Sequence, residues 1–226
     1  MNGSVPTPKD HTDILDSLLV DYVNGGLPAA LELLVETHIA MNNKSARTVD
    51  LLLHVGGYLL EESEPVSMSE GALEAVMAEI ERTKPVQASA LQDNDDPLVS
   101  AHLPRPIADY MPDLDCAQSW RRVGIGLAEH QLDFGQTKGK ATIYRIAPGV
   151  AVPTHSHKGS EITLVLAGGF SDENGSYVPG DIAIQHAGSV HQPVADDDGE
   201  CIVFAVNEDS IELTGPLGRM LNLLVR

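Results

Sequence analysis

Two glycine-bounded blocks in the C-terminal half of the chain constrain its fold more than any other feature. In the first block, Gly149 and Gly168 enclose His155, His157 and Glu161. Residues two apart in a β-strand point to the same face, so the two histidines and, by the same parity, the glutamate face one cavity. Imidazole and carboxylate groups hold divalent first-row metals without thiolates. The block therefore predicts a metal site built on strands.

The second block begins at Gly180 and runs to His191. Together the two blocks resemble the paired motifs of the cupin superfamily, whose members are small jelly-roll barrels. The resemblance implies that the three polar residues of the first block converge with the last histidine of the second on one divalent metal. The implied ligands are His155, His157, Glu161 and His191.

Zinc is our first choice for this metal, and Mn, Fe and Ni tolerate the same ligand set. The alternative interpretation is a barrel that has lost its metal and keeps these side chains in a hydrated mouth. His186 stands where the second cupin motif usually has proline. We expect it to be a strand-end or turn residue and not a fifth ligand.

Short apolar runs surround the two blocks and are separated by Gly, Pro, Asn and Asp. Several short strands at close spacing, with turn signals between them, are typical of an all-β sandwich or barrel. The runs are ATIYRIAPG (141–149), ITLVLAGGF (162–170), DIAIQHAG (181–188), CIVFAVN (201–207) and LNLLVR (221–226).

The N-terminal part has a different pattern, in which apolar residues recur at helical spacing. Ser67 and Glu70 match a capping box in front of a fourth amphipathic segment. We expect helices over residues 12–23, from Pro28 through Ile39, from about Ala46 to Glu61, and from the capping box through Ile80.

Between the two parts, residues 83–106 are rich in proline and acidic residues and have no sustained period, which indicates a linker. We therefore expect an α+β protein of two domains. Residues 1–86 form a small all-α domain of four helices, residues 87–106 a linker, and residues 107–226 an all-β cupin jelly-roll barrel.

The charge and the cysteines exclude several classes. The net charge is −19, and residues 1–86 carry 14 acidic against 5 basic side chains with no basic stripe, which disfavours direct binding to nucleic acid. No signal-like start and no 18-residue apolar segment occur, so we expect no membrane contact and a cytoplasmic location. Cys116 and Cys201 form no CxxC spacing. We expect Cys201 to be packed in its strand.

The run LVETHIAMNNKSARTVDLLLHVGGYLLEESEPVSMSEGALEAVMAEIER (34–82), followed by the cupin blocks, resembles ChrR-type anti-sigma factors. In that family a helical zinc-binding domain holds an extracytoplasmic-function sigma factor away from RNA polymerase. A C-terminal cupin-like domain is needed for release in response to singlet oxygen or related oxidants. The resemblance covers nearly the whole chain and implies an anti-sigma-like helical domain at residues 1–86.

One departure concerns the family's helical zinc motif, His-x3-Cys-x2-Cys. The equivalent positions here are His38, Asn42 and Ser45, and the family's N-terminal histidine ligand falls near Asp13, two residues from His11. Asn and Ser are poor zinc ligands, so we expect no zinc in the helical domain. His38 is then a residue of the inner helix face that finds a local hydrogen bond.

Three functional hypotheses follow. In the first, the chain is a cytoplasmic regulator that sequesters a sigma factor through its helices and senses an oxidative or small-molecule signal at the cupin metal. In the second, it is a metal-dependent cupin dioxygenase or oxidoreductase with a vestigial helical domain. The glycine-rich hairpin at residues 166–175 resembles a turn rather than a substrate lid. In the third, sigma binding is lost and a dimeric metal-binding cupin remains, so a homodimer is left open.

Overall fold

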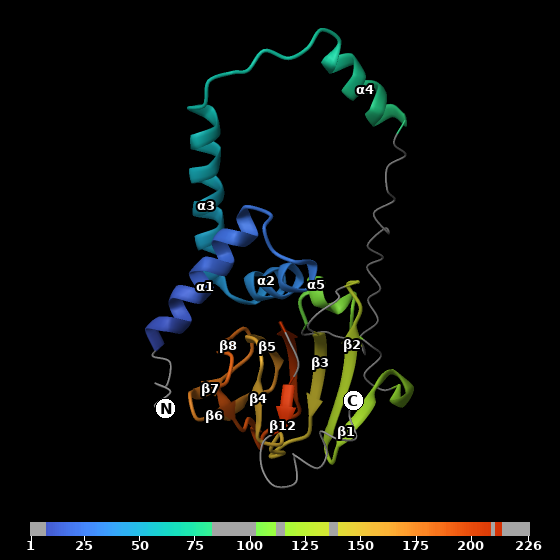
Figure 1. Ribbon diagram of the computed structural model, residues 1–226. Coiled ribbons are helices and arrows are strands. Elements are labelled where there is room, and N and C mark those ends of the chain that lie inside the picture. Colours follow the sequence, from blue (N-terminus) through green and yellow to red (C-terminus); the bar gives the residue numbers. More distant parts are fainter. Residues whose placement is uncertain (1–7, 83–102, 112–115, 136–139, 209–210, 214–226) are drawn as a thin grey trace.

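The computed structural model describes residues 8–82, 103–111, 116–135, 140–208 and 211–213 (Figure 1). Its helices are α1 (Pro8–Val23), α2 (Ala29–Met41), α3 (Asn43–Glu61), α4 (Ala72–Arg82) and α5 (Arg105–Ala108), with a short 3-10 helix at Ala117–Ser119. All four helices expected from the sequence are present, and the fold class is confirmed.

The C-terminal part is a barrel of short strands in three sheets. The strands are β1 (Arg121–Gly124), β2 (Leu127–Leu132), β3 (Lys140–Ile146), β4 (His155–His157), β5 (Glu161–Ala167), β6 (Phe170–Asp172), β7 (Gly175–Tyr177), β8 (Ile182–Gln185), β9 (Val190–His191), β10 (Val194–Ala195), β11 (Cys201–Asn207) and β12 (Ile211–Leu213). The large sheet has the order β1-β2-β3-β11-β5-β8, and the smaller sheets are β10-β6-β7 and β12-β4-β9. All neighbouring strands pair antiparallel, as in a jelly roll.

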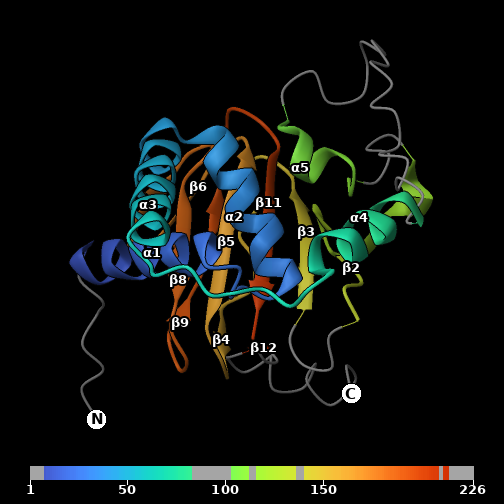
Figure 2. The same ribbon diagram turned by 90° about the horizontal axis from the view of Figure 1, so that it is seen from above.

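Helices α1 and α2 cover one face of the large sheet (Figure 2). Successive residues of β11 point to opposite faces of the sheet. Phe204 points toward the helices and lies in the same buried cluster as Leu34 of α2, whereas Val203 points into the barrel. Ile107 of α5 belongs to the same buried cluster as Leu34. Full burial of each such side chain contributes about 1.5–3 kcal/mol. The helical and β parts are therefore joined by one continuous core.

The end of α3 and the whole of α4 lie outside this core. Figure 1 shows α3 extending away from the sheet and α4 set apart from the other helices. None of the residues of α4 is buried against the described parts of the chain. Among the described residues, the apolar stripes of these two helices therefore have no intramolecular partner.

The differences from the sequence predictions are local. Helix α4 begins at Ala72, after both Ser67 and Glu70, so the predicted capping box does not cap it. Helix α5 begins inside the expected linker at residues 87–106. The expected strand at 221–226 lies outside the described residues, as does most of the linker. The domain boundaries stay a prediction.

Candidate metal centre

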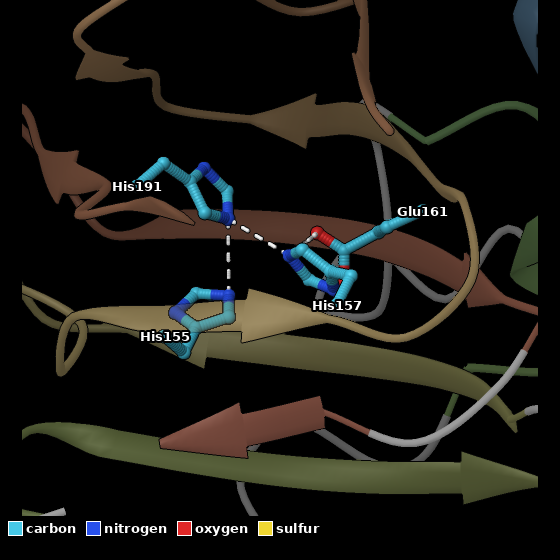
Figure 3. A group of neighbouring side chains, drawn as sticks. All are labelled: His155, His157, Glu161 and His191. Carbon is cyan, nitrogen blue, oxygen red and sulfur yellow. Dashed lines mark hydrogen bonds and ion pairs between the residues drawn. The ribbon is translucent and has the colours of Figure 1, made fainter. Parts of the chain in front are cut away.

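Strands β4 and β9 of one small sheet and β5 of the large sheet bring the predicted ligands together. His155 and His157 are the two ends of β4, and His155 lies directly opposite His191 of β9 in the antiparallel register. Glu161 is the first residue of β5. Figure 3 shows all four side chains pointing toward a common centre. One ligand atom from each lies within 4.8 Å of the others, so the four could hold one metal ion.

The hydrogen bonds of His155 and His191 determine which ring nitrogen of each carries the proton and which carries a lone pair. The Nδ1 atom of His155 lies 2.8 Å from the carbonyl oxygen of Pro153, and a carbonyl only accepts, so Nδ1 carries the proton. The Nδ1 atom of His191 lies 3.2 Å from a carboxylate oxygen of Asp172 and donates to it in the same way. In the neutral rings, both Nε2 atoms therefore present lone pairs to each other.

These two Nε2 atoms are 3.0 Å apart, and the Nε2 of His157 is also 3.0 Å from that of His191. Opposed lone pairs at this distance repel each other unless a cation or a proton lies between them. Ligands that bind a divalent first-row ion at about 2.0–2.2 Å are separated by roughly 3–4 Å, which matches this spacing. The spacing of the nitrogens is compatible with one metal ion bound among them.

Burial keeps the site in its ligating form. Desolvation, followed by the neighbouring His191, lowers the pKa of His155 to about 4 and that of His157 to about 4. The imidazoles are therefore neutral at neutral pH, as metal coordination requires. Desolvation also raises the pKa of the Glu161 carboxyl. A cation among these side chains would offset the cost of burying that carboxylate.

Asp172 is a residue of the site that the sequence did not reveal. Its side chain is fully buried, and one carboxylate oxygen accepts from His191 Nδ1 at 3.2 Å and from Gln185 Nε2 at 3.0 Å. Hydrogen bonds to His191 and to nearby backbone amides hold its pKa below the usual value, against the opposing effect of burial. A carboxylate behind a ligating imidazole fixes its ring and raises its basicity.

His186, Cys201 and His54 lie outside this centre. His186 is half-buried in the loop after β8, where a strand-end or turn residue was expected, and it is not among the clustered ligand atoms. Cys201 is fully buried in β11, and burial raises the pKa of its thiol to about 12, so the thiol stays protonated and packed. His54 is exposed on α3, and His102 lies outside the described residues.

The degenerate helical motif forms a hydrogen-bonded cluster. His38 is buried, with Nε2 2.8 Å from the Ser45 hydroxyl and Nδ1 2.8 Å from the carbonyl oxygen of Gly180. The side chain of Asn42 caps α3 by accepting from the amides of Lys44 and Ser45. The predicted local hydrogen bond of His38 is present, but a second bond reaches the barrel. Among the described residues, the only group of three or more potential metal ligands is the one in the barrel.

Comparisons with known proteins agree with this fold. Residues 115–210 match the family model described as ChrR Cupin-like domain. The anti-sigma-E factor ChrR of Cereibacter sphaeroides is 35% identical over 213 residues, which cover 94% of this chain and 97% of that protein. The crystal structure of Rhodobacter sphaeroides SigE in complex with the anti-sigma ChrR matches with a TM-score of 0.68 and 36% identity, over 85% of this chain and 96% of that chain.

The fold and the histidine-rich centre define a cupin-like protein with an N-terminal helical module. The extent of the match shows more: the chain belongs to the ChrR family of anti-sigma factors. Within the described part of the chain, no helix combines the length and apolar character that a membrane span requires.

Proposed function

We propose that this protein is a cytoplasmic anti-sigma factor that sequesters an extracytoplasmic-function sigma factor through residues 1–86 and senses a signal at the metal centre of residues 107–226. The observation that carries the proposal is the pair of apolar stripes on α3 and α4, which the described part of the chain leaves exposed. The related ChrR was crystallised with SigE, which makes a sigma factor the natural occupant of these stripes.

Each stripe has the spacing of a helix face that packs against a partner. On α3 the stripe residues are between 49% and 64% exposed, and on α4 between 50% and 67%. Soluble monomers rarely leave such contiguous apolar surface open to water, and helix faces of this kind commonly mark protein-binding sites. The stripes consist of Leu51, Val55, Tyr58 and Leu59 on α3, and of Leu73, Val76, Met77 and Ile80 on α4.

The charge of the helical module fits the same partner class. Residues 1–86 carry 14 acidic and 5 basic side chains, so the module as a whole has a negative potential. That potential favours a partner with a basic surface and speeds its association at low salt. A sigma factor must approach DNA, so a basic face is expected of it.

In the barrel, His155, His157, Glu161 and His191 would hold one divalent metal, with zinc as the first choice. A closed four-ligand site of this kind stabilises the fold and gives a signal molecule or oxidant a defined point of attack. An agent that removes or alters the metal changes sigma binding only if the metal binds the free and the complexed protein with different affinity.

The test is co-purification of the full chain with sigma factors from its own host, followed by titration of the sigma factor that binds. We expect Leu59→Asp and Val76→Asp each to weaken sigma binding by at least tenfold, because each places a charge in a desolvated helix face. The matched control is Ile125→Asp, which alters a 97% exposed residue in the turn between β1 and β2. Equal binding by all three variants would refute the proposal.

The enzyme hypothesis rests on the ligand set alone, whereas the regulator hypothesis also accounts for α3 and α4. One experiment distinguishes the enzyme hypothesis from the regulator hypothesis. A metal-dependent oxidoreductase would keep turnover in the Leu59→Asp variant, because that side chain lies on the helical module, while a regulator would lose sigma binding.

A further inference from the structure

His38 joins three parts of the molecule. It lies on α2, is 1% exposed, and makes one hydrogen bond to the barrel and one to α3. Because the Gly180 carbonyl only accepts, Nδ1 carries the proton of the neutral ring and Nε2 accepts from the Ser45 hydroxyl. Each bond is 2.8 Å long, so the ring is fixed at both ends.

On the barrel side, the residue that His38 contacts is locked to a ligand-bearing strand. The amide of Gly180 donates to the carbonyl of Val165 at 2.9 Å, and the amide of Val165 donates to the carbonyl of Asp181 at 3.0 Å. Val165 belongs to β5, the strand that begins with Glu161. A shift of β5 on metal binding would therefore move the Gly180 turn with it.

A second connection runs from the same turn through β8. That strand begins two residues after Gly180 and ends at Gln185, which lies opposite Glu161 in the sheet. Gln185 also donates to Asp172, the carboxylate that holds the ring of His191. The Gly180 turn is thus tied to two of the four metal ligands by hydrogen bonds along continuous strands.

On the helical side, Ser45 stands in the first turn of α3, beside the Asn42 cap. This is the helix whose far end carries an unpartnered apolar stripe. The end of α2 also sits closely on the barrel, since a Cβ atom built at Gly180 would lie 3.3 Å from the Cβ of Met41, at a backbone φ of +91°. The contact leaves little room for the turn to move without the helices.

We propose that His38 is a positioning residue that couples the metal centre of the barrel to the first turn of α3. Metal binding fixes β5 and β8 and so fixes the Gly180 carbonyl. His38 then holds Ser45, and with it the start of α3, in a fixed arrangement relative to the barrel. This inference rests on the proposed function, both for the metal and for the role of α3.

The experiment measures hydrogen–deuterium exchange of the full chain with and without one equivalent of Zn²⁺. In the unaltered protein we expect zinc to slow exchange in β5 and β8 and also in residues 43–50, the latter by at least about fivefold, the lower end of typical coupling between sites. In His38→Phe and in Ser45→Ala we expect the response of β5 and β8 to persist. The response of residues 43–50 should fall below twofold.

Two variants keep the test decisive, because Ser45→Ala removes one hydroxyl and leaves the buried ring and its bond to Gly180 in place. The matched control is His54→Phe, an exposed histidine of α3 whose replacement should leave the zinc response unchanged. An undiminished response of residues 43–50 in Ser45→Ala, or its absence in the unaltered protein, would overturn the inference.

The measurement also separates this inference from the proposed function, since it uses no sigma factor. Failure to bind one zinc would appear in the metal stoichiometry. It would refute the metal centre, and the coupling inference with it. Failure to bind a sigma factor would appear only in the titration and would leave the coupling result standing.

Discussion

Two histidine-containing sites, one in the barrel and one in the helical module, have opposite chemistry. In the barrel, the Nε2 lone pairs of His155 and His191 face each other at 3.0 Å, and a shared cation or proton relieves that arrangement. In the helical module, the Nε2 of His38 meets the hydroxyl of Ser45, a donor that satisfies it without a metal. The comparison teaches that the group facing the free nitrogen, and not the histidine itself, separates a metal site from a hydrogen-bonded core.

The two sites also differ in what holds their surroundings together. A zinc-dependent helical domain draws much of its folding free energy from the metal. Here Leu34 of α2 is fully buried in the same cluster as Leu164 and Phe204 of the barrel. Packing against the sheet therefore stabilises the helices where the family motif would use thiolates.

The largest expected effect is on metal content. Replacing His157 by Ala removes one of the four ligands, so metal per chain should fall from one to near zero by elemental analysis. The unaltered protein should be stabilised by about 4 kcal/mol when free metal exceeds its dissociation constant a thousandfold, and the variant should lose this. Sigma binding should survive while signal-dependent release is blocked.

The control for this variant is His186→Ala, which changes a histidine of the same region outside the cluster and should keep one metal per chain. Retention of one metal by His157→Ala would contradict the ligand assignment.

A variant that gains a metal in the helical module would test the same comparison at the His38 site. The double variant Asn42→Cys, Ser45→Cys restores the spacing His-x3-Cys-x2-Cys around a histidine whose Nδ1 already donates to a carbonyl, as ligating histidines usually do. We expect two metals per chain and, with Co²⁺, the absorption of thiolate coordination. The single variant Asn42→Cys should stay at one metal, and one metal in the double variant would refute the expectation.

Removing the carboxylate behind His191 should have a smaller effect. Asp172→Asn keeps the size of the side chain but weakens the hold on the His191 ring, and loss of such an outer contact typically costs 10–100-fold in metal affinity. Competition with a chelator of known affinity measures this. Glu173→Gln, at the exposed neighbouring position, is the control. Unchanged affinity in Asp172→Asn would remove the carboxylate from the site.

The sequence predicted the barrel centre well because its information is local. The parity of His155 and His157 in one strand and the spacing of the two blocks are enough to predict that these four side chains lie together. Asp172 escaped prediction because its contact with His191 depends on how the β6–β7 hairpin folds over β9, a long-range packing that no spacing encodes. The bond of His38 to Gly180, 142 residues away, was hidden for the same reason.

The smallest expected effect concerns pH and tests whether His38 is a neutral core residue. Burial lowers the pKa of His38 below the ordinary value of 6.5, against weaker raising effects from the bond to Gly180 and the charge of Asp181. Between the lowered pKa of His38 in the folded state and its value of about 6.5 in the unfolded state, the unfolded chain binds more protons than the folded one. Stability therefore rises with pH in this range and is lost as pH falls below about 6.5. One proton contributes a slope of at most about 1.4 kcal/mol per pH unit.

Urea unfolding of the unaltered protein and of His38→Phe, both in chelator, measures this slope. The free energies of unfolding of the two proteins should diverge by up to that slope below pH 6.5 and run parallel above it. Parallel curves throughout would mean that His38 titrates normally and is not held by the contact between α2 and the barrel.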